Sequence, residues 1–254
     1  MIHNSSLKFD TRGLEKFSLV EWPGKIAAII FTGGCNFRCP FCHNPELTNV
    51  GIRHGAYLPP PAYPWPEIEK FLDKKIGWID VIIITGGEPT IQPDLPRVLK
   101  IIKDKGYLTG IHTNGTIPKM LEKILAEKTV DKICMDIKSS LEKYSEASGV
   151  ATAGATHELP LQKQIVSSIE IIKNSGINYE FKLTLVPDIV TEEDIPMIGK
   201  MIKGAKKISL QQFRPLKTLD KSYQNKVPYE REKIVKMGKM LEKCVEEVNL
   251  DFIE

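Results

Sequence analysis

Short apolar segments alternate with longer amphipathic segments along most of the chain. The short segments are mostly rich in β-branched residues, as buried parallel strands are, and they comprise residues 25–31, 80–85, 107–113, 131–138, 178–186 and 207–213. In the longer segments apolar residues recur at intervals of three and four, which predicts helices; these include residues 94–106, 118–128, 162–176 and 192–204. Residues 228–248 are predicted to form a last long helix.

These strand–helix pairs predict an α/β fold built on a parallel sheet. Six such units with right-handed crossovers suit an incomplete (β/α)6 TIM-like barrel better than a closed barrel in a chain of 254 residues. An open doubly wound sheet is the alternative architecture. No repeat or clear boundary divides the sequence, so a single domain over residues 1–254 is expected. Residues 49–66 carry several prolines and are predicted to form an ordered surface loop.

Composition and charge argue against several classes of protein, namely nucleic-acid-binding, membrane and disulfide-stabilised secreted proteins. The chain carries 35 basic and 32 acidic residues, and this balance gives no support to binding of nucleic acid or of a membrane surface. No apolar run approaches the ~20 residues of a membrane span, and the polar N-terminal stretch lacks the apolar core of a signal peptide. Three of the five cysteines lie within eight residues, so a disulfide framework is not expected. The sequence therefore predicts a cytoplasmic protein with reduced cysteines.

Polar or glycine-rich stretches follow the predicted strands. In chain order they are the cysteine-rich residues 31–47, TGGEPT at 85–90, HTNG at 112–115, MDIK at 135–138, VPD at 186–188 and QQFRP at 211–215. Because ligands bind at the carboxyl ends of the strands in parallel α/β barrels, we expect these stretches to meet on one face.

The first of these stretches contains Cys35, Cys39 and Cys42 in the spacing Cys-x3-Cys-x2-Cys. Three thiolates can bind three irons of a [4Fe-4S] cluster and leave the fourth iron open for chemistry. The residues alone leave alternatives. The string from Cys39 to His43 also matches a c-type haem attachment motif, which would need export. A structural zinc site could use the three cysteines with His43, and a thioredoxin-like dithiol would leave Cys35 unexplained.

The cysteine stretch resembles that of the radical S-adenosylmethionine superfamily. This resemblance implies that the three cysteines bind one [4Fe-4S] cluster whose free iron is chelated by S-adenosylmethionine. It also implies that an electron from the cluster splits the sulfonium to give methionine and a 5′-deoxyadenosyl radical. Phe41 matches the aromatic residue beside the adenine. Residues 86–89, GGEP, match the motif that holds the methionine amino group, and Glu88 would accept from that ammonium.

Further motifs resemble those of glycyl-radical enzyme activating enzymes. Asp136 and Lys138 match an Asp-x-Lys pair that faces the cofactor, and they are the candidate catalytic residues; the alternative is a solvated pair at a strand end. Thr113 and Asn114 match a Thr-Asn-Gly motif, for which the alternative is a plain Asn-Gly turn. The residues expected to bind the cofactor are Phe41, Cys42, His43, Asn44, Gly86, Gly87, Glu88, Pro89, Thr113, Asn114, Asp136, Lys138 and Phe213. Asn44 could instead cap a helical turn, and Phe213 could instead be a core residue.

Over nearly its whole length the chain is most similar to activating proteins of anaerobic ribonucleoside-triphosphate reductase. This resemblance implies a stable glycyl radical made on a protein partner, the large reductase subunit, and a flavodoxin- or ferredoxin-type electron donor. Pyruvate formate-lyase activation, a deazaguanine-forming enzyme and a non-enzymatic metal-binding module are the alternatives. Three positions depart from the family pattern: Glu21 replaces Asp, Lys182 replaces Arg, and His112 replaces an Asp that helps to bind a monovalent cation. Cys134 and Cys244 are expected to be core residues.

Overall fold

The computed structural model describes residues 7–48, 58, 60–150 and 160–252. These residues fall into two compact units. The first comprises Met1–Asn36, Glu46–Thr113 and Lys119–Ile133, and the second comprises Phe37–Pro45, Asn114–Pro118 and Cys134–Glu254. The expectation of a single domain stays a prediction.

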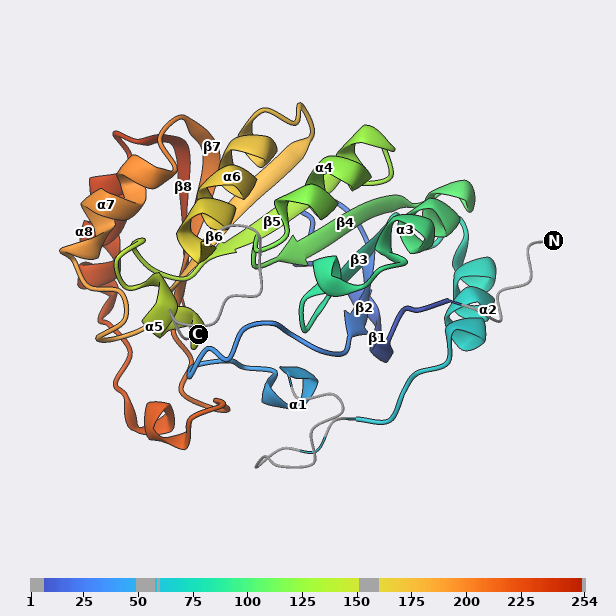
Figure 1. Ribbon diagram of the computed structural model, residues 1–254, viewed down its shortest axis with the longest axis horizontal. Coiled ribbons are helices and arrows are strands. Elements are labelled where there is room, and N and C mark those ends of the chain that lie inside the picture. Colours follow the sequence, from blue (N-terminus) through green and yellow to red (C-terminus); the bar gives the residue numbers. More distant parts are fainter. Residues whose placement is uncertain (1–6, 49–57, 59, 151–159, 253–254) are drawn as a thin grey trace. The chain divides into compact units, whose positions relative to one another are not determined.

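The first unit is built on four neighbouring strands, which Figure 1 shows in chain order. They are β1 (Thr11–Ser18), β2 (Ala27–Thr32), β3 (Val81–Gly86) and β4 (Leu108–Thr113). β1 pairs antiparallel with β2, whereas β2, β3 and β4 are parallel. Their connections contain α1 (Pro45–Thr48), α2 (Trp65–Lys75), η1 (Pro89–Ile91) and α3 (Leu95–Asp104), and α4 (Pro118–Ala126) follows β4. Each parallel strand therefore delivers its following loop to the same edge.

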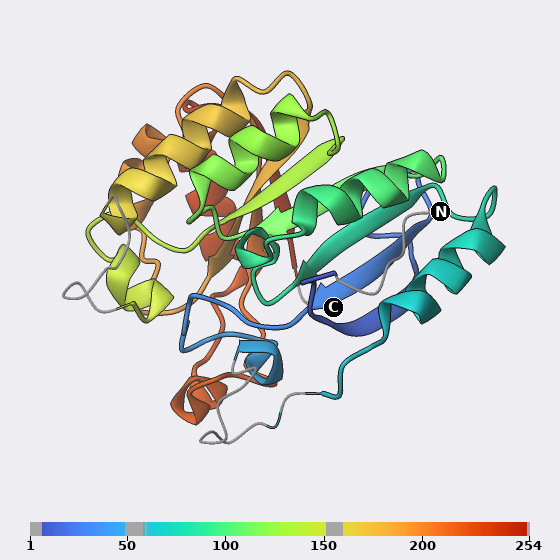
Figure 2. The same ribbon diagram turned by 45° about the vertical axis from the view of Figure 1, so that its right-hand side comes forward.

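The second unit repeats this pattern. Three strands are parallel neighbours: β6 (Asn178–Leu185), β7 (Ala205–Gln212) and β8 (Val245–Asp251). The preceding strand, β5 (Lys132–Ile137), has its first two residues in the first unit and the others in the second. Between these strands lie α5 (Tyr144–Ser148), α6 (Leu161–Lys173), α7 (Asp194–Met201), η2 (Lys221–Asn225) and α8 (Arg231–Leu241). α8 packs on β7, β8 and α7, and Figure 2 shows these elements from a second side.

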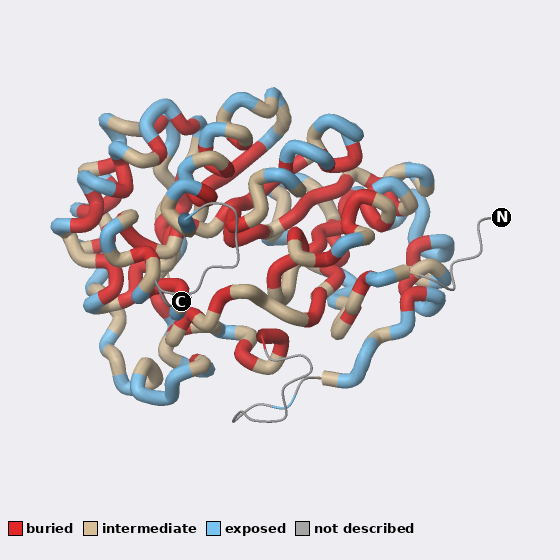
Figure 3. Tube along the Cα trace, in the orientation of Figure 1, coloured by how far each residue is buried: buried red, intermediate tan, exposed pale blue. Residues whose placement is uncertain are grey.

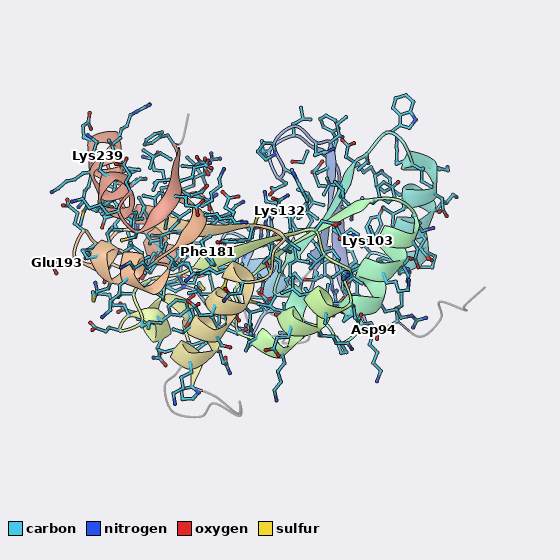
Figure 4. The ribbon with its side chains drawn as sticks, turned by 90° about the horizontal axis from the view of Figure 1, so that it is seen from above. Asp94, Lys103, Lys132, Phe181, Glu193 and Lys239 are labelled. Atoms are coloured by element: carbon cyan, nitrogen blue, oxygen red, sulfur yellow. The ribbon has the colours of Figure 1, made fainter. Side chains whose placement is uncertain are left out.

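Burial follows the pattern of apolar residues in the sequence. In the first unit Ala27, Ile29, Val81 and Ile83 form one buried cluster across two strands, and in the second Phe181 is fully buried on β6. Figure 3 shows buried backbone concentrated along the strands and the inner sides of the helices. Figure 4 marks the two ends of α3 with Asp94, which precedes the helix, and Lys103 in its last turn. Among the described residues no helix is long and apolar enough to cross a membrane.

The structure confirms the six expected strands and the four expected helices. It differs from the prediction near the two ends of the chain, where β1 and β8 were not expected. β1 was not predicted, because its side chains alternate only weakly between buried and exposed. The predicted helix over residues 228–248 is wrong at its end, since α8 stops at Leu241 and β8 begins at Val245. The predicted loop at 49–66 lies largely outside the described residues, and α2 already begins at Trp65.

Candidate functional site

In the first unit, the glycines after β3 allow that strand end to approach the segment before Cys35. A Cβ on Gly87 would lie 1.8 Å from the Gly34 carbonyl oxygen, and a Cβ on Gly86 would lie 2.5 Å from the Thr32 nitrogen. The Gly87 N–H donates to the Thr32 carbonyl at 2.9 Å, and the Glu88 N–H donates to the Gly34 carbonyl at 2.8 Å. These glycines were expected to let backbone approach a ligand. The structure shows a close approach between two loops of the protein itself.

Glu88 is buried at the start of η1, with 1% of its surface exposed. Its Oε1 accepts from the Thr90 N–H at 3.0 Å, the Thr90 hydroxyl at 2.5 Å and the Thr113 hydroxyl at 2.7 Å. Two of the predicted site motifs, GGEP and the Thr113 motif, are thereby joined by a direct hydrogen bond. A carboxylate held by several donors has a fixed orientation, as a residue that receives an ammonium group requires.

Gln92 was not selected from the sequence, yet this residue helps to fix the segment before Cys35. Its Nε2 donates to the Gly33 carbonyl at 2.7 Å, and its Oε1 accepts from the Asp10 N–H at 3.1 Å. The Gly33 N–H in turn donates to the Asp10 carbonyl at 2.9 Å. Gln92 therefore joins the segment before β1, the segment after β2 and the end of η1.

Two of the three positions that depart from the family pattern contact each other. His112 Nε2 lies 3.3 Å from Glu21 Oε2, and both side chains are mostly buried. Lys132 Nζ donates to the Glu21 carbonyl at 3.1 Å and lies over the Trp22 ring. Lys182, the third position, is half-buried on β6. The sequence contained both members of the His112–Glu21 pair but gave no sign that they would meet.

In the second unit, the cysteine loop (Phe37–Pro45) carries Cys39 and Cys42 and is held by three surrounding segments. The Cys42 N–H donates to the Cys39 carbonyl at 3.0 Å, which closes a turn between the two thiols. The Arg38 N–H donates to the Ser148 carbonyl at the end of α5. The Asp220 N–H donates to the Pro40 carbonyl beside η2. The third anchor is His43, whose Nε2 lies 3.0 Å from the Arg214 carbonyl oxygen.

Asp136 and Lys138 form an ion pair close to Cys39. Lys138 Nζ lies 2.9 Å from Asp136 Oδ2. Burial lowers the pKa of Lys138, but the Asp136 carboxylate, followed by negative charge on the Cys39 sulfur, raises this pKa well above its usual range. Lys138 is therefore an ammonium at neutral pH, and its positive charge lies near a predicted cluster ligand.

Tyr144 was not selected from the sequence, but it lies beside this ion pair. It is fully buried, its hydroxyl donates to the Asp136 carbonyl at 3.4 Å, and its ring meets Phe37 edge-to-face at 6.5 Å. Burial, as the largest cause, raises the pKa of the Tyr144 phenol. The phenol is therefore neutral at physiological pH.

His43 and Phe213 stack on each other, with ring centroids 6.0 Å apart and planes 13° from parallel. Desolvation lowers the pKa of His43, the Arg214 carbonyl raises it, and the cations Lys138 and Arg214 lower it further, so that the net change is downward. Phe213 has no exposed surface, as the core alternative expects, and its proposed stacking on adenine stays a prediction. Phe41 is buried, with its ring 6.4 Å from that of Tyr223.

Two further predictions concern Asn114 and the remaining cysteines. Asn114 Oδ1 accepts from the Thr116 N–H at 3.0 Å and from the Thr116 hydroxyl at 2.7 Å, and its predicted contact with the cofactor stays a prediction. Cys134 is buried, but its Sγ lies 3.9 Å from Glu180 Oε2, so its surroundings are not purely apolar. Cys244 is only half-buried. In the described residues no three His, Cys, Asp or Glu side chains converge as they would on a single metal ion.

The sequence model of the Radical SAM superfamily matches residues 29–202, which is more than half of the chain. The chain belongs to the radical SAM superfamily. Enzymes of this superfamily use a [4Fe-4S] cluster and S-adenosylmethionine. The residues present fit these groups, because one turn, closed by the Cys42 N–H and the Cys39 carbonyl, brings Cys39 and Cys42 together.

Similar proteins indicate which family within the radical SAM superfamily the chain belongs to. The chain is 31% identical over 238 residues to a candidate glycyl-radical enzyme activating enzyme of Methanocaldococcus jannaschii, covering 93% of each protein. It is 26% identical over 209 residues to the pyruvate formate-lyase-activating enzyme of Clostridium pasteurianum, covering 81% of each. The chain is therefore a radical SAM enzyme of the glycyl-radical enzyme activase family.

Solved structures agree on the fold. SuiB of Streptococcus suis bound to precursor peptide SuiA matches with a TM-score of 0.61 at 18% identity, over 89% of this chain and 48% of SuiB. TYW1 with a lysine-pyruvate adduct matches with a TM-score of 0.56 at 18% identity, over 85% of this chain and 73% of TYW1. The fold is the α/β radical SAM fold, in which helices connect parallel strands, as the order of strands and helices predicted.

Proposed function

We propose that this radical SAM enzyme generates the glycyl radical of anaerobic ribonucleoside-triphosphate reductase. The observation that carries the proposal is the Asp136–Lys138 ion pair beside Cys39, in a chain similar over 93% of its length to a candidate glycyl-radical enzyme activating enzyme. The specific target rests on the resemblance of the sequence to the reductase activators. A glycyl-radical enzyme is the partner that this family requires.

In the proposal, Cys35, Cys39 and Cys42 bind the [4Fe-4S] cluster and leave one iron for S-adenosylmethionine. With one electron from a flavodoxin- or ferredoxin-type donor, the bound groups supply reductive cleavage to methionine and a 5′-deoxyadenosyl radical, which removes the Cα hydrogen of the target glycine. Glu88 receives the ammonium of the cofactor, and Lys138 and Asp136 orient its methionyl part. The residues of the chain hold the reacting groups in place, because a radical this reactive must form next to its target.

The ligand assignment is tested by metal content and by single cysteine variants. Anaerobic reconstitution should give about four irons and four sulfides per chain. Replacing any one of the three cysteines by Ala should abolish reductive cleavage of S-adenosylmethionine. The matched controls Cys134→Ala and Cys244→Ala should retain cleavage. One zinc and no iron after strictly anaerobic purification would contradict the assignment.

The target is tested by electron paramagnetic resonance after mixing the reduced enzyme with S-adenosylmethionine and one partner at a time. A glycyl doublet should develop on the anaerobic reductase and should be absent when its C-terminal glycine is replaced by Ala. A doublet on pyruvate formate-lyase and none on the reductase would transfer the assignment to the second candidate. That candidate is favoured by the similarity to two pyruvate formate-lyase-activating enzymes, at 26% and 28% identity.

A small-molecule substrate is the remaining alternative. The chain is 36% identical to the 7-carboxy-7-deazaguanine synthase of Aquifex aeolicus, but over only 126 residues, which is 46% of the chain. If a small molecule is consumed together with S-adenosylmethionine while neither protein partner gains a radical, the activase proposal fails.

A further inference from the structure

Tyr144 joins the two ends of the Asp136–Lys138 segment. Its side chain has no exposed surface. Its hydroxyl donates to the Asp136 carbonyl at 3.4 Å, and the Lys138 backbone N–H lies close enough to the phenol to lower the pKa that burial raises. One phenol group therefore contacts the backbone on both sides of Ile137, at the carboxyl end of β5.

The helix that begins at Tyr144 also holds the cysteine loop. The Ser148 carbonyl accepts from the Arg38 N–H at 2.7 Å, and the Phe37 ring packs edge-to-face on Tyr144. Gly149 ends the helix with a φ of 65°, and a Cβ there would lie 2.2 Å from the Arg38 carbonyl oxygen. Only glycine allows the end of α5 to come this close to the residue that precedes Cys39.

We infer that Tyr144 is a positioning residue that fixes the Asp136–Lys138 segment relative to Cys39. α5 is the common support, because its first residue holds the strand end and its last turn holds the cysteine loop. The inference goes beyond the proposed function and rests on it in one respect, the ligation of the cluster by Cys39. Tyr144 does not contact the reacting atoms in this scheme; it acts through the residues that it orients.

The charge of Lys138 gives this arrangement a measurable consequence. A cation held near a cluster thiolate stabilises the added electron, so it raises the reduction potential of the cluster. If the hydroxyl of Tyr144 is removed, the strand end loses its hydrogen bond at the Asp136 carbonyl and the phenol's interaction with the Lys138 N–H, so the ammonium of Lys138 is held less firmly relative to the cysteine loop. The potential should then become more negative, and S-adenosylmethionine should bind less tightly.

The test compares Tyr144→Phe with Tyr179→Phe, which removes the same group from another buried tyrosine of the second unit. The Tyr179 hydroxyl accepts from the Lys206 N–H at 2.9 Å, at the amino end of β6. With the reconstituted enzyme, Tyr144→Phe should retain the full iron content, shift the midpoint potential to a more negative value and weaken S-adenosylmethionine binding roughly threefold to tenfold. Tyr179→Phe should shift neither quantity.

Hydrogen–deuterium exchange gives a second measurement that does not need the cluster. The amide of Lys138 should exchange faster in Tyr144→Phe than in the wild type, and equally in Tyr179→Phe and the wild type. If the wild-type chain binds no cluster, the proposed function is wrong. Faster exchange at Lys138 in Tyr144→Phe alone would still support the positioning role of Tyr144. Unchanged potential, binding and exchange in Tyr144→Phe, or equal changes in both variants, would overturn the inference.

If Tyr144→Phe does not fold, a second variant, Gly149→Ala, tests whether α5 positions the cysteine loop. Gly149→Ala leaves the phenol in place but forces the Arg38 carbonyl away from α5. The inference predicts faster exchange of the amides from Phe37 to Cys39, unchanged exchange at Lys138 and a shifted midpoint potential. A potential and an exchange pattern equal to those of the wild type would show that α5 does not set the position of the loop.

Discussion

Glu88 depends on hydroxyl groups from two neighbouring segments, and one of them can be removed with a matched control. Thr113→Val deletes the hydroxyl that donates to Glu88 at 2.7 Å. Thr109→Val deletes a hydroxyl on the same face of β4, which donates to the Thr129 carbonyl at 2.7 Å and contacts Asp131 at 3.1 Å. Each variant should lose about 1 kcal/mol of stability.

Only Thr113→Val should affect the cofactor. The KM for S-adenosylmethionine should rise roughly threefold to tenfold in this variant, because the carboxylate that we propose to receive the ammonium loses a fixed donor. In Thr109→Val the KM should equal that of the wild type. An equal rise in both variants would mean that the effect follows from stability and not from Glu88.

The contact between His112 and Glu21 changes the expectation for monovalent cations. The resemblance to glycyl-radical activases implies an acidic residue at the position of His112, but here an imidazole faces the Glu21 carboxylate at 3.3 Å. His112→Asp would place two carboxylates in the space of this pair, and a cation would relieve their repulsion. We therefore expect cleavage of S-adenosylmethionine to respond weakly to added potassium in the wild type and strongly in His112→Asp.

The double variant Glu21→Gln/His112→Asp is the control for that prediction, since it restores a single carboxylate. Its response to potassium should be smaller than that of His112→Asp. If the wild type requires potassium for cleavage, His112 does not substitute for a cation, and the interpretation of this position is wrong.

At the scale of single residues, the sequence predicted which motifs matter better than it predicted what their side chains contact. GGEP and the Thr113 motif were both selected, and they meet in one hydrogen bond. Tyr144 and Gln92 were missed, because a buried aromatic residue in a short helix and an amide after a turn have no distinctive spacing. Gln92 contacts a backbone carbonyl 59 residues away, and Tyr144 contacts one eight residues away at the end of the preceding strand, and no helical or strand periodicity encodes either contact.

At the scale of elements, the glycine pair after β3 sets how closely two loops of the first unit pack. Gly87→Ala places a Cβ within 1.8 Å of the Gly34 carbonyl oxygen, so the segment before Cys35 must move. We expect a loss of roughly 2–3 kcal/mol in urea unfolding and a lower iron content after reconstitution. Gly77→Ala is the matched control, because Gly77 has a φ of +80° but an added Cβ meets nothing within 4 Å. This control should cost only about 1 kcal/mol and should retain iron.

Asp194 joins α7 to the segment before α5, and this contact should make stability depend on pH. Burial of its carboxyl raises the pKa, but the donors Lys143, Thr191 and Ser140 outweigh burial and lower the pKa below its usual value. A lowered carboxyl pKa stabilises the fold above the unfolded pKa of about 3.9, and this contribution is lost as the pH falls through the folded pKa.

Asp194→Asn should therefore be less stable than the wild type at pH 7 by roughly 2 kcal/mol. The difference should shrink as unfolding is measured at progressively lower pH below about 4. A difference that stays constant on acidification would show that the shape of the side chain matters and its charge does not.

The two elements that the sequence missed lie at the two ends of the strand order. β1 is an edge strand with few buried side chains, so it lacks the continuous β-branched run of β2 and β3. β8 carries Val245 and Val248 three residues apart, an interval that continues the helical pattern of α8. Pairing with β7 determines its conformation, and that pairing is a long-range interaction that overrides local preference.

At the scale of the whole molecule, the strand–helix alternation was sufficient to predict the fold class, because buried parallel strands have a distinctive composition.

The charge of the chain leads to a prediction about the electron donor. The net charge is +3, and the segment that contains η2 packs on the cysteine loop through Asp220 and Pro40 and through Tyr223 and Phe41. Lys221 is exposed on this segment. A small acidic flavin or iron–sulfur protein would be attracted to a cation so placed.

We therefore expect cleavage of S-adenosylmethionine driven by an acidic flavodoxin to slow as salt is raised, while cleavage driven by dithionite stays constant. Lys221→Glu should slow the flavodoxin-driven rate roughly threefold to tenfold at low salt and should not change the dithionite-driven rate. Lys239→Glu reverses the same charge on the exposed side of α8 and changes the net charge equally (Figure 4). If both variants slow the donor by the same factor, the donor senses only the net charge of the protein. If Lys221→Glu alone slows it, the electron enters beside η2, next to the loop that carries Cys39 and Cys42.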